Sequence, residues 1–318
     1  MLSRSVSRPV GLVLGVGLDR VLADPARWHP VAGFGTLAAR LEHTTYADRR
    51  SAGAAHVLLL VGGCVALGGA AERAARGRPV AQALVTAAAT WTVLGGTSLG
   101  REAAEAARLL EAGRLAEARS QVARLVGRDT RTLTADEVAR AALESLAENT
   151  SDAVVAPLVL GAVAGVPGLL GYRAANTLDA MVGHRSARYA RFGWAAARLD
   201  DVLNLPGARL TAALATLLGA DPAASLGAWR RDAGAHPSPN AGPVEAAFAG
   251  ALGVRLGGRT VYGTGADARI ELRPVLGDGR TPAAHDVVRG RRLADRVGLG
   301  ALIVLAPIAA RPARRRRR

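Results

Sequence analysis

Three carboxylates lie four positions apart, at Glu144, Glu148 and Asp152. Residues four apart share one face of a helix, so the three form an acidic stripe if the segment is helical. Like charges at this spacing repel unless a metal ion or a cluster of arginines faces them. A solvated stripe is the ordinary alternative, but this stripe leads into an apolar segment of membrane length, where charges are costly and rarely idle. We therefore predict catalytic roles for Glu148 and Asp152 and a substrate contact for Asn149.

A second polar group follows that apolar segment, between Arg173 and His184. Asn176 and Asp179 are three positions apart and share a helical face. The guanidinium of Arg173 is suited to a phosphate or carboxylate, because it offers a planar fork of donors. We predict substrate contacts for Arg173, Asn176 and His184 and a catalytic role for Asp179. Pairing of arginine with aspartate inside the fold is an equally open interpretation.

The adjacent carboxylates Asp200 and Asp201 form a third candidate site, with Arg198 just before them and Asn204 just after. Mg²⁺ in proteins is held by one or two carboxylates together with substrate phosphate oxygens. We predict that Asp200 and Asp201 bind Mg²⁺ and that Arg198 contacts a substrate phosphate. The acidic residues of all three groups are expected to converge on one centre at a lipid–water boundary.

Near the start of the chain, Asp24 is followed by His29. A histidine in this position can act as a general base or simply hold a loop by hydrogen bonds, and we include His29 among the catalytic candidates. The chain's six histidines show no metal-ligand spacing, so a zinc site is not expected.

These groups must be positioned by helices, because the apolar residues are mainly Ala, Leu, Val and Gly and aromatics make up only 3%. Residues 52–71 and 79–100 carry no formal charge, and each is long enough for a spanning helix. A short connector makes them a predicted antiparallel hairpin. Glycines 11, 15 and 17 are typical of close helix packing. The predicted spans or embedded segments are 9–23, 52–71, 79–100, 153–172, 205–220 and 297–310.

The segment 153–172 contains Gly165-Val-Pro-Gly168 at its centre, a strong helix-breaking signal. Each half covers roughly 15 Å as a helix, which is about half the hydrocarbon thickness of a bilayer. We therefore predict a bent hairpin that returns the flanking polar groups to one side of the membrane.

The rest of the chain is expected to be helical and water-exposed, with Gly113 as a turn and Thr134 opening a helix through a capping box. Residues 225–289 are rich in Gly and Pro and predict long loops, with a small hairpin near 260–272. The whole is predicted as an all-α, polytopic membrane protein with one domain, 1–311. A disordered basic tail, 312–318, is expected to follow it.

The charge of +15 comes entirely from arginine, since the chain contains no lysine. This composition excludes a phosphate-binding loop of the Walker type and a pyridoxal Schiff base, both of which need lysine. The arginines flank apolar segments rather than alternating with aromatics, so a membrane is expected as the partner and nucleic acid is not. The single cysteine, Cys64, excludes an intrachain disulfide.

Together these motifs resemble the adenosylcobinamide-phosphate synthase family, CobD/CbiB, over nearly the whole chain. The resemblance rests on the following motifs in order: Asp19-Arg-Val-Leu-Ala-Asp24-Pro25, His29-Pro30-Val31, Val126-Gly-Arg-Asp129-Thr, Glu144-Ser-Leu-Ala-Glu148-Asn149-Thr150-Ser-Asp152, Asn176-Thr-Leu-Asp179-Ala-Met-Val-Gly183-His184, Phe192-Gly-Trp194-Ala-Ala-Ala-Arg198-Leu-Asp200-Asp201, Ser238-Pro-Asn240-Ala-Gly242 and Ala251-Leu-Gly-Val-Arg-Leu-Gly-Gly258. Two positions depart from the family pattern, because Leu205 and Pro243 stand where an aromatic is common.

The resemblance implies a multi-pass protein of the cell inner membrane that joins adenosylcobyric acid to an aminopropanol phosphate, giving adenosylcobinamide phosphate. It also implies ATP and Mg²⁺ as cofactors, other enzymes of the cobalamin pathway as partners, and a substrate contact for Asn240. Two other functions fit the residues. An intramembrane prenyltransferase would use Asp/Asn clusters to bind a diphosphate through Mg²⁺, and a corrinoid carrier or scaffold would bind without turnover.

Overall fold

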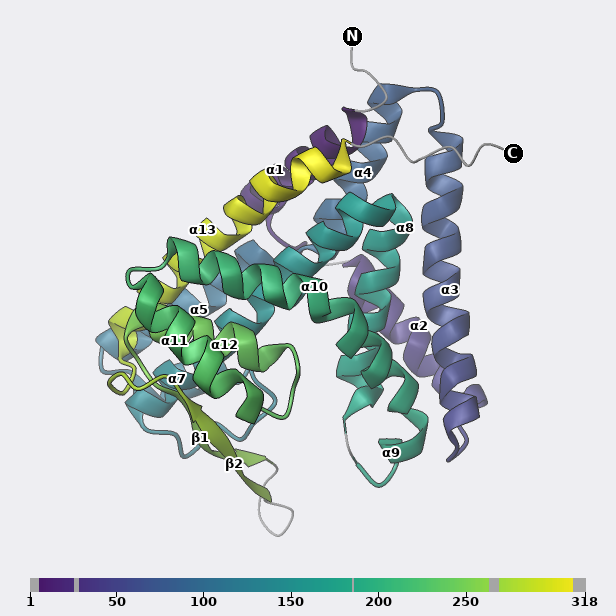
Figure 1. Cartoon of the computed structure of the whole chain (residues 1–318). Coiled ribbons are helices and arrows are strands. Elements are labelled where there is room, and N and C mark those ends of the chain that lie inside the picture. The colour runs from purple at the N-terminus through teal and green to yellow at the C-terminus, as the bar shows by residue number, and fades with distance from the viewer. Residues whose placement is uncertain (1–5, 26–28, 185, 263–268, 311–318) are drawn as a thin grey trace. The chain divides into compact units, whose positions relative to one another are not determined.

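The computed structural model describes residues 6–25, 29–184, 186–262 and 269–310. The described chain is mostly helical, as predicted, with one small two-stranded sheet (Figure 1). The predicted disordered tail, 312–318, lies outside the described residues. By its internal contacts the chain forms two compact units, each assembled from separate stretches of sequence. The first comprises residues 1–95, 156–204 and 302–318, and the second comprises residues 96–155 and 205–301.

The first unit is built around long apolar helices. Its complete helices are α1 (Ser7–Leu22), α2 (Pro30–Thr45), α3 (Arg50–Ala74), α4 (Pro79–Val93), α8 (Ala156–Leu178) and the short α9 (Tyr189–Phe192). Residues 194–204 of α10 (Trp194–Leu218) belong to it as well.

Small residues allow α1 to pack closely on α4. A Cβ added to Gly11 would lie 2.5 Å from Cβ of Thr86, and one added to Gly15 would lie 2.4 Å from Cβ of Thr90. Two of the three glycines predicted to serve packing therefore do so, whereas Gly17 has nothing within 4 Å. Since α4 packs mainly on α1 and only slightly on α3, the predicted pairing of 52–71 with 79–100 is wrong.

Helix α8 reverses direction at Gly165, which has φ 71° and ψ −149°. A Cβ added to Gly168 would lie 2.3 Å from the carbonyl oxygen of Leu160. In a straight helix these residues would be roughly 12 Å apart, so the arms 156–164 and 166–178 run back along each other. The break lies inside the Gly-Val-Pro-Gly segment that predicted it.

Two charged residues hold this bend. The Val166 N–H, at the start of the second arm, donates to Oε1 of Glu72 at 2.9 Å. Nη1 of Arg8 donates to the carbonyl oxygen of Ala162, near the end of the first arm, at 3.3 Å. Arg8 and Glu72 also face each other at 3.8 Å. The break therefore leaves backbone groups that α1 and α3 satisfy.

Two helical stretches of the described chain are long and apolar enough to cross a membrane, namely α3 and the run Ala135–Gly183 that contains the α8 bend. The predicted span 79–100 is not one helix, because α4 ends at Val93 and a new helix begins at Gly96. At 15 residues α4 is about 22 Å long, short of the ~30 Å hydrocarbon layer. Segments 205–220 and 297–310 coincide mostly with the later parts of α10 and α13 (Ala284–Ala309).

The second unit carries the remaining elements. They are α5 (Gly96–Glu111), α6 (Leu115–Val122), α7 (Ala135–Thr150), a π-helical turn (Ser151–Val155), the later part of α10, α11 (Pro222–Asp232), α12 (Ala241–Leu252), β1 (Leu256–Tyr262), β2 (Arg269–Leu276) and most of α13. Thr134 caps α7 through the predicted capping box with Glu137, and Gly113 forms the turn between α5 and α6 with φ 71°. The antiparallel strands, with Thr260 opposite Glu271, confirm the small hairpin.

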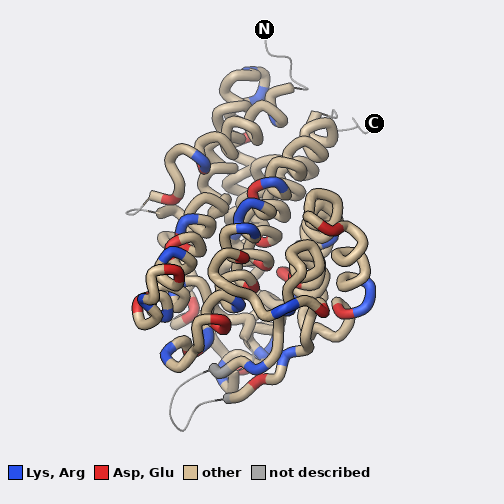
Figure 2. Tube along the Cα trace, turned by 90° about the vertical axis from the view of Figure 1, so that its left-hand side faces the viewer, with Lys and Arg blue, Asp and Glu red and all other residues tan. Residues whose placement is uncertain are grey.

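Charged residues of both signs are interspersed along the chain in the view of Figure 2.

Candidate functional site

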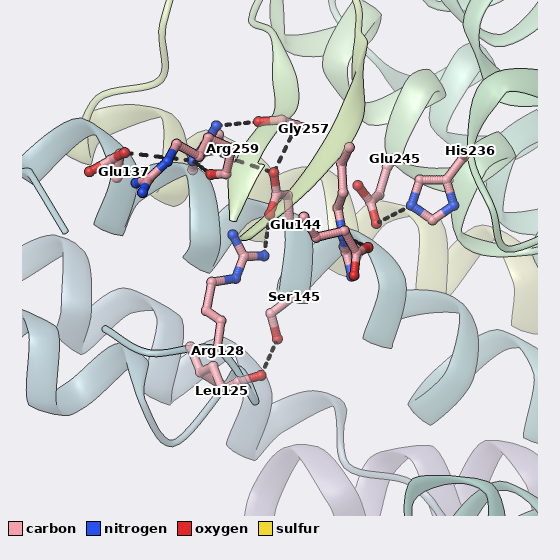
Figure 3. Close-up of polar contacts among 12 residues, drawn as sticks. Leu125, Arg128, Glu137, Glu144, Ser145, His236, Glu245, Gly257 and Arg259 are labelled. Atoms are coloured by element: carbon pink, nitrogen blue, oxygen red, sulfur yellow. Dashed lines mark hydrogen bonds and ion pairs between the residues drawn. The ribbon is translucent and has the colours of Figure 1, made fainter. Parts of the chain in front are cut away.

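The acidic stripe begins at Glu144, which is 2% exposed on α7 in the second unit (Figure 3). Two arginines face this carboxylate. Nη2 of Arg128 donates to Oε2 of Glu144, and Nε of Arg140 lies 3.9 Å from Oε1. The Gly257 N–H, at the start of β1, donates to the same Oε1 at 2.8 Å. Each oxygen of Glu144 therefore accepts one hydrogen bond.

Arg140 also joins α7 to β1, because its guanidinium donates to the carbonyl oxygens of Gly257 and Arg259. A Cβ at Gly258, which has φ 89°, would lie 2.7 Å from Nη1 of Arg140. Glycine at this position therefore permits the close approach of the arginine.

The predicted residues further along the stripe are placed as follows. Glu148 lies one helical turn beyond Glu144 and is partly exposed, and Asp152 lies in the π-helical turn that follows α7. Such turns are frequent at functional sites. Nδ2 of Asn149 donates to the carbonyl oxygen of Ser145 at 2.9 Å and to Oγ of Ser145 at 3.2 Å. The catalytic roles of Glu148 and Asp152 stay predictions.

The structure adds two residues that sequence reasoning missed, His236 and Glu245. Nε2 of His236 lies 4.0 Å from Oε1 of Glu245, and both side chains are buried (Figure 3). Burial, reinforced by the carboxylates of Glu144 and Glu148, raises the pKa of Glu245 well above its usual value. Burial also lowers the pKa of His236. Burial therefore favours the neutral form of both groups.

A signal for Glu245 was present in the sequence. It is the only charged residue in the otherwise apolar run 241–252, and every residue of that run is buried. A lone carboxyl in a fully buried helix needs a partner or a function. Nothing in the spacing of the chain, however, connected it with His236.

Asn240, the predicted substrate contact, is buried at the start of α12. Its Oδ1 accepts a hydrogen bond from Nη1 of Arg209 at 3.1 Å, and the same nitrogen donates to the carbonyl oxygen of Pro239 at 2.7 Å. These bonds hold the loop that carries His236, so Asn240 has at least a structural role.

In the first unit, Asp200 is the centre of a second polar network. It accepts hydrogen bonds from Nδ2 of Asn204 at 2.9 Å and from Nδ2 of Asn176 at 3.3 Å. Nη1 of Arg173 donates to Oδ1 of Asn176 at 3.2 Å, and the Tyr172 hydroxyl donates to Oδ1 of Asn204 at 2.7 Å. The structure thus brings together Arg173, Asn176 and Asp200, which the sequence placed in two separate motifs.

Arg173 also borders an apolar cavity of about 320 Å³. The cavity is formed by α2, α3, α4 and the second arm of α8, and its wall includes Phe34, Cys64 and Thr177. One cationic side chain in a mostly apolar lining suits a mostly apolar ligand with one anionic group.

The two adjacent aspartates do not present one common face. Asp200 is buried, whereas Asp201 is half-buried with Nη1 of Arg198 at 3.7 Å. Burial raises the pKa of Asp201, and Arg198 partly opposes this effect. Both Asp200 oxygens accept amide N–H groups, and no cluster of three or more metal-binding side chains occurs among the described residues. The predicted role of Asp200 and Asp201 as Mg²⁺ ligands stays a prediction.

Asp179 opens a second π-helical turn, Asp179–Gly183, after α8. A Cβ added to Gly183 would lie only 1.8 Å from Oδ1 of Asp179, so the carboxylate lies directly over the glycine. His184 follows the turn and meets the ring of Tyr189 edge-on, with centroids 5.0 Å apart. Glycine at 183 therefore sets the position of Asp179.

His29 caps the start of α2, because its Nδ1 accepts the Val31 N–H at 3.1 Å. Its Nε2 lies 3.4 Å from Oδ1 of Asp24. These contacts match the loop-holding interpretation of His29, and its role as a base stays a prediction.

The candidate residues are divided between the two units. Glu148, Asn149, Asp152 and Asn240 belong to the second, and the predicted residues from Asp179 to Asp201 belong to the first. Their convergence on one centre stays a prediction.

Comparison with known proteins shows which family these features belong to. The model of the family described as CobD/Cbib protein matches residues 12–294. The chain is 53% identical to the cobalamin biosynthesis protein CobD of Mycobacterium tuberculosis over 94% of this chain and 95% of that one. It is 43% identical to the protein of the same name from Chromobacterium violaceum, over 90% and 91% of the two chains. It is 42% identical to the protein of the same name from Rhodobacter capsulatus, over 94% of this chain and 96% of that one. No solved structure matches the chain. Since the match extends over nearly the whole chain and includes every polar group described above, the protein belongs to the CobD/CbiB family of cobalamin biosynthesis proteins.

Proposed function

We propose that the chain is the amide-forming ligase that joins adenosylcobyric acid to an aminopropanol phosphate, giving adenosylcobinamide phosphate. The observation that carries the proposal is the family match over residues 12–294, with relatives whose name states a role in cobalamin biosynthesis. The two buried polar networks support it, because a ligase needs placed acids and arginines for a carboxylate, an amine and phosphate groups.

The chemistry requires activation, since a carboxylate does not condense with an amine in water unaided. In the proposal, ATP supplies a phosphoryl group to the corrinoid carboxylate, so that ADP leaves and an acyl phosphate forms. The amine nitrogen then attacks the acyl carbon, a C–N bond forms, and the C–O bond to phosphate breaks. Arg173 and Arg198 are proposed to hold the anionic groups, and Glu148, Asp152, Asp179 and His29 remain the candidates for proton transfer. Mg²⁺ enters as the counter-ion of the nucleotide.

We propose further that the protein is a multi-pass protein of the cell inner membrane, with other enzymes of the cobalamin pathway as its partners. The length and apolar character of α3 support this location. So do its large exposed side chains, among them Leu58 at 74% and Leu67 at 64%, since such residues are unusual in a row on a water-facing helix.

The test is an assay of the purified protein in detergent with adenosylcobyric acid, aminopropanol phosphate, ATP and Mg²⁺, with the product identified by mass. We expect amide product and one ADP for each amide. Replacing the amine with isoprenoid diphosphates tests the prenyltransferase alternative. Tight corrinoid binding without turnover under any condition would identify a carrier and contradict the proposal.

The roles of the networks are tested by Asp200→Asn and Arg173→Gln. Asp200→Asn keeps the side-chain size, Arg173→Gln shortens the side chain and removes its charge, and Glu111→Gln, on the exposed end of α5, is the control. We expect the first two to reduce amide formation at least tenfold and the control to leave it unchanged. Full activity in Asp200→Asn would remove the Asp200 network from the site.

A further inference from the structure

The pair formed by His236 and Glu245 contains two buried polar atoms that the fold leaves unsatisfied. Among the described residues, no hydrogen bond reaches Nε2 of His236 or Oε1 of Glu245. Glu245 is 1% exposed and the His236 side chain 4%. Unsatisfied buried polar atoms are rare and costly in folded proteins. Nε2 of His236 and Oε1 of Glu245 face each other at 4.0 Å, which indicates that a further polar atom binds between them.

The hydrogen bonds around His236 determine what its free nitrogen can do. The Ser238 N–H donates to Nδ1 of His236 at 3.0 Å, whereas the contact of Nδ1 with the Ser238 carbonyl oxygen is longer, at 3.4 Å. Nδ1 is thus an acceptor, and the neutral ring must carry its proton on Nε2. The free nitrogen of His236 is therefore a hydrogen-bond donor that points toward Glu245.

The surroundings of Glu245 favour its protonated form. The neighbouring Glu144 receives the direct N–H donors of this region, from Arg128 and Gly257, whereas Oε1 of Glu245 receives none. A buried carboxyl without hydrogen-bond donors is held neutral, because burial penalises the charged form. The charged and titratable groups that face this site come from α7, from the segment before it, from β2 and from the loop after α11: Glu144, Glu148, Arg128, Glu271, Arg273 and His236.

We propose that His236 and Glu245 form a pair of hydrogen-bond donors for one acceptor oxygen, that of the acyl group at which the proposed ligase forms its amide. The inference rests on the proposed function. An oxygen about 2.8 Å from both atoms fits between donors that are 4.0 Å apart. The loop that carries His236 is at the surface, because Pro237 and Pro239 on either side of Ser238 are exposed. The acyl oxygen enters from this side.

The two donors act in the step that makes the amide. As the amine nitrogen attacks the acyl carbon, the electrons of the C=O bond move onto oxygen, and the two donors stabilise the negative charge that develops there. The C=O bond then re-forms, the C–O bond to phosphate breaks, and the phosphate leaves with its electron pair. The proton lost by nitrogen passes through one of the candidate bases named above to the departing phosphate, so that the two donors themselves keep their protons.

Matched substitutions separate this role from that of a base or a structural residue. Glu245→Gln keeps a donor of the same size, and Glu245→Leu removes it. His236→Asn keeps an acceptor for the Ser238 N–H in the place of Nδ1 but loses the Nε2 donor. His43→Asn and Glu111→Leu, at exposed positions, are the controls. Amide formation is measured as kcat and KM, and folding as the thermal midpoint in detergent.

We expect Glu245→Leu and His236→Asn to lower kcat by about 10²- to 10³-fold with little change in KM, and Glu245→Gln to keep kcat within about tenfold of the parent. Raising the pH through the pKa of Glu245 ionises the donor, so parent activity falls on the alkaline side and Glu245→Gln escapes this fall. The inference is overturned if Glu245→Gln is inactive while Glu245→Leu is active. It is also overturned if Glu245→Leu and His236→Asn both keep full kcat, which is the result expected if only a buried water lies between the two side chains.

An infrared spectrum gives a readout that does not depend on turnover. The parent at pH 7 should show the carbonyl stretch of a buried carboxylic acid, shifted in D₂O and absent from Glu245→Gln. Lack of that band overturns the inference even if the protein is an active ligase. Failure of the parent to form the amide, by contrast, contradicts the proposed function itself, and the inference falls with it.

Discussion

At the scale of single residues, the chemistry of a carboxyl group depends on which polar and charged groups the fold places around it. Glu144 and Glu245 are both buried glutamates in the same unit, yet only Glu144 receives arginines and a backbone N–H. Hydrogen-bond donors therefore reach both oxygens of the first, whereas burial raises the pKa of the second well above its usual value. Their different environments, not their residue type, assign them different chemistry.

The buried pair of Arg128 and Glu144 makes a stability prediction. Arg128→Met removes the partner of a carboxylate that is 2% exposed, and breaking such a pair costs about 3–5 kcal/mol because an uncompensated charge stays buried. We expect a large fall in the thermal midpoint in detergent. The control Arg114→Met breaks an exposed pair with Glu117 and should leave the midpoint unchanged. Equal effects of the two changes would show that the Arg128–Glu144 contact is not buried in solution.

Gly183 allows a test of Asp179. Gly183→Ala places a methyl group where Oδ1 of Asp179 lies, 1.8 Å away, so the carboxylate must move. If Asp179 takes part in the reaction, a displacement of this size lowers kcat by up to ~10²-fold. Gly17→Ala, where the added Cβ meets nothing within 4 Å, is the control. Unchanged kcat in Gly183→Ala would remove Asp179 from the catalytic candidates.

At the scale of elements, the bend in α8 shows how a helix break deep in an apolar unit is maintained. A break leaves backbone groups without intrahelical partners, and these are costly where water is scarce. Glu72 and Arg8 supply the partners from two other helices. Because Arg8 and Glu72 also form an ion pair with each other, the bend and the positions of α1 and α3 stabilise one another.

Gly165→Ala tests the bend. The glycine has φ 71° and ψ −149°, a conformation that costs other residues about 1–3 kcal/mol, and an added Cβ would lie 2.1 Å from Oε1 of Glu72. We expect a clear loss of stability in a thermal melt. Gly62→Ala, on the open side of α3, should be neutral or stabilising by up to ~1 kcal/mol. If Gly165→Ala melts like the parent, the chain does not reverse at this residue.

At the scale of the whole molecule, the proposed membrane location can be tested through the only cysteine. Cys64 lies in the middle of α3, partly buried and beside the apolar cavity. In sealed vesicles, a membrane-impermeant maleimide should not label Cys64, whereas a permeant one should. Alkaline carbonate should leave the protein in the membrane pellet. Release by carbonate, or labelling by the impermeant reagent, would contradict a spanning α3.

A feature of the fold could be predicted from the sequence where its signal lies within a few neighbouring residues. The capping box at Thr134, the turn at Gly113 and the break at Gly165 are each encoded within a few residues, because they depend on backbone preferences and short-range hydrogen bonds. The predicted span 79–100 is not one helix, because α4 ends at Val93 and α5 begins at Gly96. The local signal for this break is the pair Gly95-Gly96, and the prediction gave more weight to the absence of charge. The site residues from Arg173 to Asp201 were found by their motifs, but their roles are not decided by position alone.

The sequence by itself determined that this is a helical, arginine-rich chain of the CobD/CbiB family, since composition, helix signals and ordered motifs are properties of the linear chain. Only the tertiary structure decided that α1 rather than α3 packs on α4, that arginines neutralise Glu144, and that His236 faces Glu245. The physical reason is that partner choice depends on shape and burial. The close contact between Gly11 and Thr86, or the loss of water around Glu245, exists only once distant segments have come together.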